Sequence, residues 1–117
     1  MTVDEVIAYC MAKPGAEESY PFGDHELVPK VGEKSFAFIR FDEKTVAVKC
    51  ADTDEAAAVL RDRYPDDVET TSYIGRFGWN TVKIGGKVPA KELRELLDES
   101  YETVVSKLPK KKRPDTT

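Results

Sequence analysis

Two runs of alternating side chains in the middle of the chain constrain its fold most. In residues 34–41 and 45–50, apolar side chains recur with a period of two, and Asp42-Glu43 lies between the runs. Side chains of a β-strand point to alternate faces, so this period predicts a hairpin with a two-residue turn at Asp42 and Glu43. Because both faces of the first run carry large apolar side chains, we expect it inside a sheet that helices cover on at least one face.

The segments around this hairpin have the periods of three helices and further strands. A capping box at Thr2 and Glu5 predicts a first helix that ends near Pro14. Apolar side chains at helical spacing predict a long last helix from Pro89 to Leu108. The other predicted elements are a strand over 27–31 with Pro29 at an edge or bulge, a helix from a cap at Asp52 to Pro65 with Ala56, Val59, Leu60 and Tyr64 on its apolar face, and strands over 68–73 and 81–84.

The order of these elements predicts the fold class. Strands that are adjacent in sequence and joined by tight turns favour an antiparallel meander. We therefore expect an α+β two-layer sandwich, with an antiparallel sheet of about five strands and the N- and C-terminal helices packed on one face. The length of 117 residues is typical of one domain, which we place at residues 1–108, followed by a basic, disordered tail at 109–117.

Charge is unevenly distributed along the chain. The net charge is -4, but residues 1–106 carry -8 and residues 107–117 carry +4. A nucleic-acid-binding protein normally has a basic footprint, so the folded body would have to gather its cations locally or use the tail. The tail is either a nucleic-acid patch or a solubilising end of the last helix, and its cations are Lys107, Lys110, Lys111, Lys112 and Arg113.

The sequence predicts a cytoplasmic protein. Cys10 and Cys50 have neither a metal-binding nor a redox-motif spacing, so we expect reduced, packed thiols. Asp4 and Glu5 stand where a signal peptide would carry positive charge, and no apolar run has the length of a membrane span. We expect no membrane partner and a monomer.

Few groups in the sequence suit catalysis. The one histidine, His25, lies between Asp24 and Glu26 in a predicted turn, where it could act as a general acid or simply occupy the surface. No cluster of histidine and cysteine suits a metal, and no glycine-rich phosphate loop is present. We expect a non-enzymatic protein with no catalytic residues, no metal site and no cofactor.

A predicted loop at residues 74–80 combines side chains that suit recognition. Arg76, Phe77, Trp79 and Asn80 could contact phosphates, stack on bases or form a protein interface, or the two aromatic rings could simply cap the core. The stretch from Gly75 to Gly78 also matches the GXXG loop of KH domains. That loop joins two helices, whereas this one is predicted to join strands.

Three segments together resemble the MmcQ/YjbR family of small bacterial proteins. They are Tyr-Pro-Phe-Gly at 20–23 followed by residues 31–37, then Val-Lys-Cys at 48–50, then Trp-Asn-Thr-Val at 79–82 followed by Ser-Tyr at 100–101. The resemblance spans residues 1–108 and implies a fold similar to that of frataxin and CyaY. Members often carry histidine and lysine in the loop before the tryptophan, where this chain keeps only Arg76 as a cation. The matching positions are Pro21, Phe22, Gly23, Lys49, Trp79 and Asn80.

The resemblance also implies a DNA-binding role of the double-wing type, in which hairpins of the sheet approach the duplex. Two alternatives stay open: a protein-interaction or small-ligand module with a groove around Phe22, Tyr73 and Trp79, and metal binding through acidic helix residues, of which the first helix has only Asp4 and Glu5. The residues expected at a DNA interface are Lys30, Lys34, Arg40, Lys49, Arg76, Lys83, Trp79 and Asn80.

Overall fold

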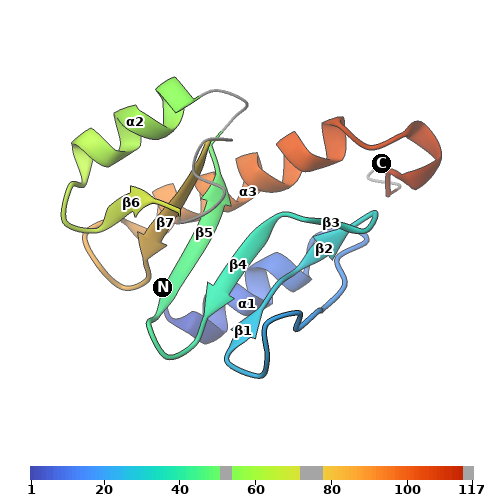
Figure 1. Ribbon diagram of the computed structural model, residues 1–117, viewed down its shortest axis with the longest axis horizontal. Helices are drawn as coiled ribbons and strands as arrows, with labels where there is room; N and C mark the ends of the chain where they lie inside the picture. The colour runs from blue at the N-terminus through green and yellow to red at the C-terminus, as the bar shows by residue number, and fades with distance from the viewer. Residues whose placement is uncertain (51–53, 72–77, 115–117) are drawn as a thin grey trace.

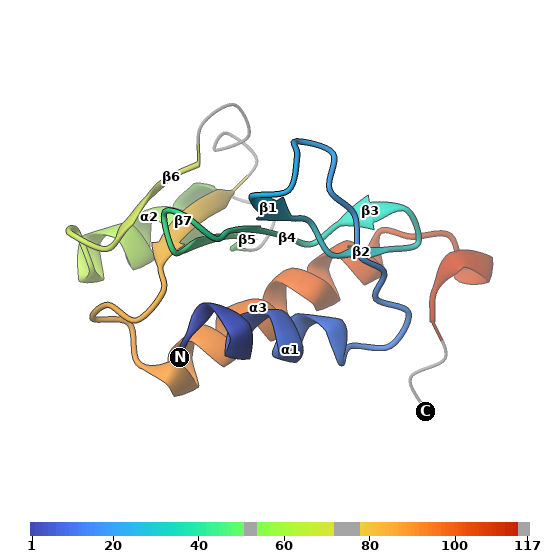
Figure 2. The ribbon, with the colours of Figure 1, turned by 90° about the horizontal axis from the view of Figure 1, so that it is seen from below.

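The two terminal helices cover one face of an antiparallel sheet (Figure 1, Figure 2). The computed structural model describes residues 1–50, 54–71 and 78–114. Helix α1 (Val3–Met11) and helix α3 (Ala90–Ser106) lie in one layer, and the capping box of Thr2 and Glu5 starts α1 as predicted. The predicted α+β two-layer sandwich is thus confirmed. Within the described parts of the chain, no helix is long and apolar enough to cross a membrane.

The order of the strands differs from the predicted meander. Five strands pair in the order β1-β4-β5-β7-β6, so β5 lies beside β7 instead of β6. The inner position goes to β7 because most of its residues are buried, whereas β6 exposes two of its three residues. The strands are β1 (Glu26–Leu27), β4 (Ala37–Arg40), β5 (Thr45–Lys49), β6 (Val68–Thr70) and β7 (Trp79–Lys83).

The central hairpin forms as predicted, with a longer turn. Strands β4 and β5 pair from Ala37 opposite Val48 to Arg40 opposite Thr45. Four residues, 41–44, connect them in place of the expected two, and Lys44 adopts a left-handed conformation with φ 55°. A longer loop allows the chain to reverse without a glycine at the turn.

The predicted strand over 27–31 and the predicted first strand of the central hairpin are each divided in two. Pro29, which has no N–H to donate, separates β1 from β2 (Lys30–Val31), and Phe36 separates β3 (Lys34–Ser35) from β4. Strands β2 and β3 pair with each other and form a small hairpin at one end of the molecule (Figure 1), and Lys30 of β2 also bridges to Glu17.

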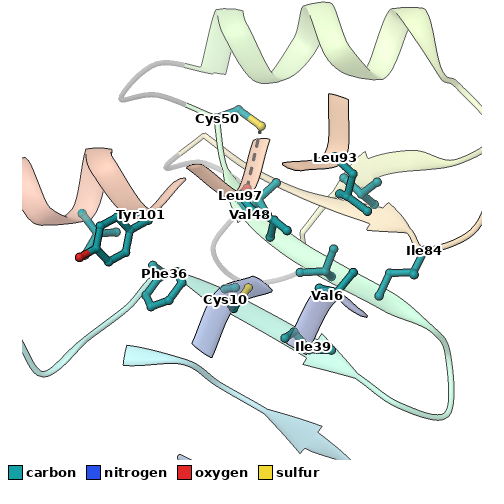
Figure 3. Packing of buried hydrophobic residues seen from close by; sticks show 14 of the residues in the cluster. Val6, Cys10, Phe36, Ile39, Val48, Cys50, Ile84, Leu93, Leu97 and Tyr101 are labelled. Atoms are coloured by element: carbon teal, nitrogen blue, oxygen red, sulfur yellow. Dashed lines mark hydrogen bonds between the residues drawn. The ribbon is translucent and has the colours of Figure 1, made fainter. Parts of the chain in front are cut away.

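Apolar side chains from alternate strand positions fill the space between the sheet and the helices. Ile39 and Val48 from the sheet meet Val6 and Leu97 from the helices in one cluster (Figure 3). The ring of Phe36 is fully buried and meets the edge of the Tyr101 ring, with a centroid distance of 5.2 Å. This burial is the main source of the stability of the fold.

Among the described residues, two polar side chains are buried on this face, Asn80 and Ser100, and both make hydrogen bonds. The Ser100 hydroxyl on α3 accepts from the Lys49 amide at 2.9 Å and donates to the Phe36 carbonyl at 2.6 Å. The Asn80 amide nitrogen donates to the Ala57 carbonyl at 2.9 Å. These bonds tie α3 and α2 to the sheet at fixed positions, since an unpaired polar group would be costly there.

Helix α2 (Asp54–Arg63) presents a different face from the predicted one. Ala57 and Leu60 are buried against the sheet, but the Val59 residue is 61% exposed. The predicted cap at Asp52 lies outside the described residues. Because α2 packs beside the β6–β7 edge, a narrower apolar stripe is sufficient to cover it.

The first part of the basic tail, as far as the structure describes it, lies against the end of α3, and the disorder of the tail stays a prediction. Residues Lys110–Lys112 form a 3-10 helix, and the Arg113 guanidinium donates to the carbonyls of Ser106 and Leu108. These contacts cap the end of α3, where cations are favourable. The last part of the predicted tail, residues 115–117, lies outside the described residues.

Candidate ligand groove on the open sheet face

The sheet face opposite α1 and α3 carries a groove of about 430 Å³. Its floor consists of strand residues that alternate with core residues, among them Phe38, Arg40, Ala47 and Thr81. The connection that precedes β1 rises above this face (Figure 2). Its residue Phe22 lines the groove. The alternation of the strands thus gives the sheet one face for the core and one for this groove.

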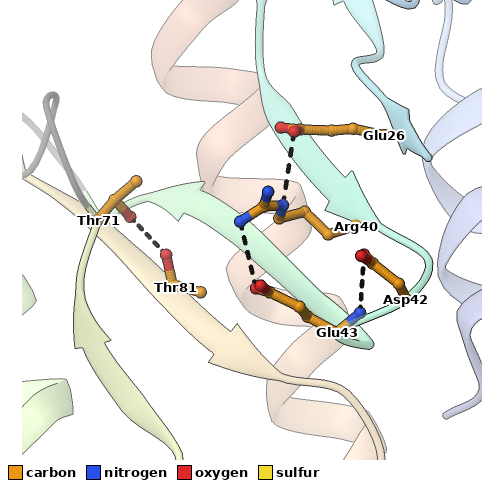
Figure 4. Close-up of polar contacts among 6 residues, drawn as sticks. All are labelled: Glu26, Arg40, Asp42, Glu43, Thr71 and Thr81. Carbon is orange, nitrogen blue, oxygen red and sulfur yellow. Dashed lines mark hydrogen bonds and ion pairs between the residues drawn. The ribbon is translucent and has the colours of Figure 1, made fainter. Parts of the chain in front are cut away.

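Arg40 lies between two carboxylates in the groove (Figure 4). Its Nη1 atom is 3.2 Å from Oε2 of Glu43, and its Nε atom is 3.6 Å from Oε2 of Glu26. Glu26 is only 8% exposed, so Arg40 supplies the counter-charge that a buried carboxylate needs. The Nε atom is itself buried and has no hydrogen-bond partner among the described residues.

The charges that line the groove sum to a negative value. Arg40 and the one histidine, His25, meet three carboxylates, those of Glu26, Glu43 and Glu69. Glu69 comes from the edge strand β6, on the far side of the groove from Glu26. One guanidinium cannot neutralise three carboxylates, so the described lining of the groove carries an excess of carboxylates.

Aromatic rings and hydroxyl groups complete the lining. Phe22 is 59% exposed, and Phe38 contributes to the floor. The Trp79 ring lies against Phe38 edge to face, with a centroid distance of 5.3 Å. The hydroxyl oxygens of Thr71 and Thr81 are 3.0 Å apart and share a hydrogen bond (Figure 4). The groove therefore offers apolar, hydrogen-bonding and anionic contacts together.

The structure brings some of the predicted recognition residues to this face. Phe22 and Arg40 line the groove, with Pro21 and Gly23 exposed beside Phe22. Strand alternation places Lys49 and Lys83 on the same face, opposite Trp79 and Thr45 in the ladder. Trp79 is buried and reaches the groove only through Phe38.

Other predicted contacts lie elsewhere. Asn80 was expected in an exposed loop, but it is fully buried on the helix-covered face, where Nη1 of Arg61 donates to its side-chain oxygen at 2.8 Å. Its place in β7 opposite Val48 turns it away from the groove. Lys30 and Lys34 lie on the β2–β3 hairpin, outside the groove lining. Arg76, Tyr73, Phe77 and the GXXG stretch before Gly78 lie outside the described residues.

Sequence patterns did not single out the acidic and hydroxyl residues of the groove. Thr45 precedes the core residue Val46, and Thr81 precedes Val82, so the period of two already assigned both threonines to the face away from the core. Glu26 and Glu69 carried no such signal, because their strands are short and lie far apart in sequence.

Nucleophilic and metal chemistry find little support in the described residues. Burial raises the pKa of the Cys10 thiol to about 12 and that of Cys50 to about 11, so neither is a thiolate at neutral pH. No three histidine, cysteine, aspartate or glutamate residues in the described ranges are grouped to hold a metal ion.

A second hollow, of about 230 Å³, lies between α2 and α3. Val59 and Leu96 line it together with glutamates of α3. Of these, Glu92 already accepts from Arg63 at 3.0 Å and from the Tyr64 hydroxyl at 2.5 Å. Ligand sites usually measure about 300–1,000 Å³, so the open-face groove is the better candidate.

Comparisons with known proteins identify the family of this chain but say little about its activity. The sequence model of the YjbR family matches residues 11–103. The uncharacterised protein YjbR of Escherichia coli K12 is 35% identical over 113 residues, which cover 97% of this chain and 95% of the E. coli protein.

Two crystal structures have a similar fold. That of Deinococcus radiodurans protein DR2400, of domain family DUF419, has a TM-score of 0.85 and 32% identity and covers 96% of this chain and 85% of the other. A Pseudomonas syringae protein, at 19% identity and a TM-score of 0.69, covers 88% of this chain and 99% of its own and shows the fold alone. The family match and the E. coli relative, taken together, place this chain in the YjbR family.

Proposed function

We propose that this protein is a non-enzymatic, cytoplasmic binding protein whose open-face groove takes a small organic cation with an apolar part. The observation that carries the proposal is the lining, in which Glu26 and Glu43 flank Arg40, Glu69 lies on the far side of the groove, and Phe22 exposes an aromatic ring. The volume of about 430 Å³ suits a ligand of modest size.

Charge and shape both favour a cation over an anion. Arg40 is shared by Glu26 and Glu43, and among the described residues Glu69 has no cation beside it within ion-pair distance. An amine or guanidine would add the missing positive charge, while its apolar part could lie against Phe22 and Phe38. An anionic ligand would have to displace a carboxylate from Arg40 first.

Duplex DNA on the same face is the competing candidate, since the family resemblance implies a double-wing role. Arg40, Lys49 and Lys83 supply cations on this face. Glu26, Glu43 and Glu69 lie among them, and each would repel a phosphate. Membership of the family leaves this role untested, and the charge of the groove argues for the smaller cationic ligand.

The test uses the one tryptophan as the reporter, because Trp79 contacts a ring of the groove floor. The full chain is titrated with phenethylamine, with its neutral analogue phenethyl alcohol and with phenylacetate, and affinities are confirmed by calorimetry. We expect saturable binding of the amine alone. Binding of phenylacetate in preference to the amine, or of duplex DNA in a manner sensitive to Glu69→Gln, would refute the proposal.

Two matched variants locate the binding. Glu69→Gln keeps the shape of an exposed edge-strand residue and removes its charge, so affinity for the amine should fall about tenfold, equal to about 1.4 kcal/mol. Glu102→Gln makes the same change on the exposed side of α3 and should have no effect. Equal losses in the two variants would mean that the amine responds to overall charge instead of to the groove.

A further inference from the structure

The open-face groove has carboxylates at two opposite ends. Glu69 lies on the edge strand β6, and Glu26 lies on the opposite edge strand β1. Four strand spacings and an offset of two residues along the strands separate them, so their backbones are roughly 20 Å apart. Because both side chains reach over the sheet, a ligand that meets both carboxylates needs donors separated by about 10–15 Å.

The end of the groove at β1 and β4 keeps one carboxylate in excess. Glu26 and Glu43 share Arg40, whose guanidinium lies between them (Figure 4). Two carboxylates and one guanidinium leave an unbalanced negative group at this end, just as Glu69 does at the other. Among the described residues, the other lysines of this sheet face, Lys49 and Lys83, lie outside the groove lining.

Glu26 is a buried acceptor whose hydrogen bonds are incomplete. The residue is 8% exposed and lines the groove. Within the parts of the chain that the structure describes, the group nearest in charge is Nε of Arg40, which at 3.6 Å lies beyond hydrogen-bond distance. A buried carboxylate normally accepts hydrogen bonds on both oxygens. An ammonium group, which has three donors, could complete them from the side of the groove.

The floor between the two ends is largely apolar. Phe38, Ala47 and Thr81 lie side by side on β4, β5 and β7, in a line of the ladder that ends at Glu69. Each of these residues lines the groove, and the small alanine in the middle keeps the floor low. A chain of methylene groups along this line buries no polar group without a partner.

We infer that the groove takes a linear aliphatic diamine or polyamine, with one ammonium group at Glu69 and a second at Glu26 and Glu43. The inference rests on the proposed function, and it adds the second ammonium group and the length of the chain between the two. Each ammonium group balances one carboxylate in excess, while the methylene groups cover the apolar line. A ligand with a single charge would leave one end of the groove unbalanced.

The test compares three amines by calorimetry on the full chain at one ionic strength: octamethylenediamine, tetramethylenediamine and octylamine. The two diamines differ in length at equal charge, whereas octamethylenediamine and octylamine differ in charge at equal chain length. We expect the long diamine to bind about tenfold more tightly than either of the others. Equal affinities within either pair would overturn the inference and leave the proposed function standing. Absence of binding by all three amines would refute the proposed function and the inference with it.

A substitution at each end of the groove separates the two ammonium sites. The Glu43 side chain is 55% exposed, so Glu43→Gln should leave the fold intact and remove the excess carboxylate beside Arg40. Affinity for octamethylenediamine should then fall about tenfold, whereas that for octylamine, whose ammonium group lies at the distant Glu69, should change by less than about twofold. Glu69→Gln should weaken the binding of both amines.

Two further variants complete the series. Glu26→Gln should act as Glu43→Gln does, provided that thermal denaturation shows a folded protein, because it removes the buried acceptor itself. Glu102→Gln, on the exposed side of α3, should change neither affinity. Equal losses for octamethylenediamine and octylamine in Glu43→Gln would overturn the inference, since they would mean that no second ammonium group is bound at that end.

Discussion

The two faces of the central sheet are built from the same strands, yet they differ in polarity and in exposure to solvent. Toward α1 and α3, residues such as Ile39 and Val48 are fully buried, and the polar groups among them are paired. On the open face, Arg40 beside Ile39 and Thr45 beside Val46 are partly exposed and line a groove. A shift of one residue along a strand is thus the difference between a residue that stabilises the fold and one that can meet a ligand.

Substitutions on the helix side should therefore affect mainly stability, and substitutions on the open face should affect mainly binding. Helix-side residues are held by dense packing, so their loss cannot be compensated by solvent. Open-face charges are partly solvated, so their removal costs less. We therefore expect a graded series, from changes that threaten folding to changes that leave the fold intact and alter the groove.

The largest effect should come from Phe36→Ala on the helix side. The ring is fully buried and packs against Tyr101, so its removal leaves a cavity and should lower the free energy of unfolding by about 3–5 kcal/mol. Urea denaturation followed by circular dichroism measures this. Phe22→Ala is the matched control on the exposed wall, and a comparable cost there would break the distinction between the faces.

Ser100→Ala should have the next largest effect. It leaves the Lys49 amide and the Phe36 carbonyl without their shared hydroxyl in a dry environment, which should cost about 1–3 kcal/mol. Ser106→Ala, on the exposed end of α3, should change stability by less than about 0.5 kcal/mol. Chemical denaturation of both variants measures the difference, and equal values would show that the buried hydroxyl has no special role.

Alkaline pH should weaken the helix side by a smaller amount. Burial raises the pKa of Cys10 to about 12 and that of Cys50 to about 11, so the unfolded chain releases these protons first. Stability is therefore complete well below the ordinary thiol pKa of 9.0 and is lost as the pH rises from there toward the folded values, by roughly 1.4 kcal/mol per thiol at pH 10.

Denaturation curves from pH 8 to 10 test this linkage, since most tyrosine and lysine side chains titrate higher. Cys10→Ala should reduce the loss by about half. An unchanged pH dependence in Cys10→Ala and in Cys50→Ala would contradict the assignment of the effect to the buried thiols.

The smallest effect on stability should come from Arg40→Gln on the open face. The pair with Glu43 is exposed, and the Gln amide can still donate a hydrogen bond to the buried Glu26 carboxylate, so we expect a loss of only about 1 kcal/mol. Affinity of the groove for phenethylamine should rise, because two carboxylates lose their internal partner. A fall in that affinity, measured by calorimetry, would mean that Arg40 itself holds the ligand and that the groove prefers anions.

Local patterns sufficed for the parts of the fold that local forces decide. The alternation around Asp42 predicted the β4–β5 hairpin, and the apolar stripe from Leu93 to Leu108 predicted α3. The partner of β5 was not predictable, because β6 and β7 could each pair with it, and the choice depends on burial in the assembled sheet. The groove was only half predictable for the same reason: Phe22 and Arg40 stood out, but Glu26 and Glu69 come from opposite edge strands that local patterns cannot align.

The central claim about this protein is that its ligand binds on the open face of the sheet. Intermolecular nuclear Overhauser effects between phenethylamine and the full chain test this directly. We predict contacts from the ligand ring to Phe22, Phe38 and the Thr81 methyl group, all of which line the open-face groove. Contacts to Val59 and Leu96, in the hollow between α2 and α3, would contradict binding in the open-face groove.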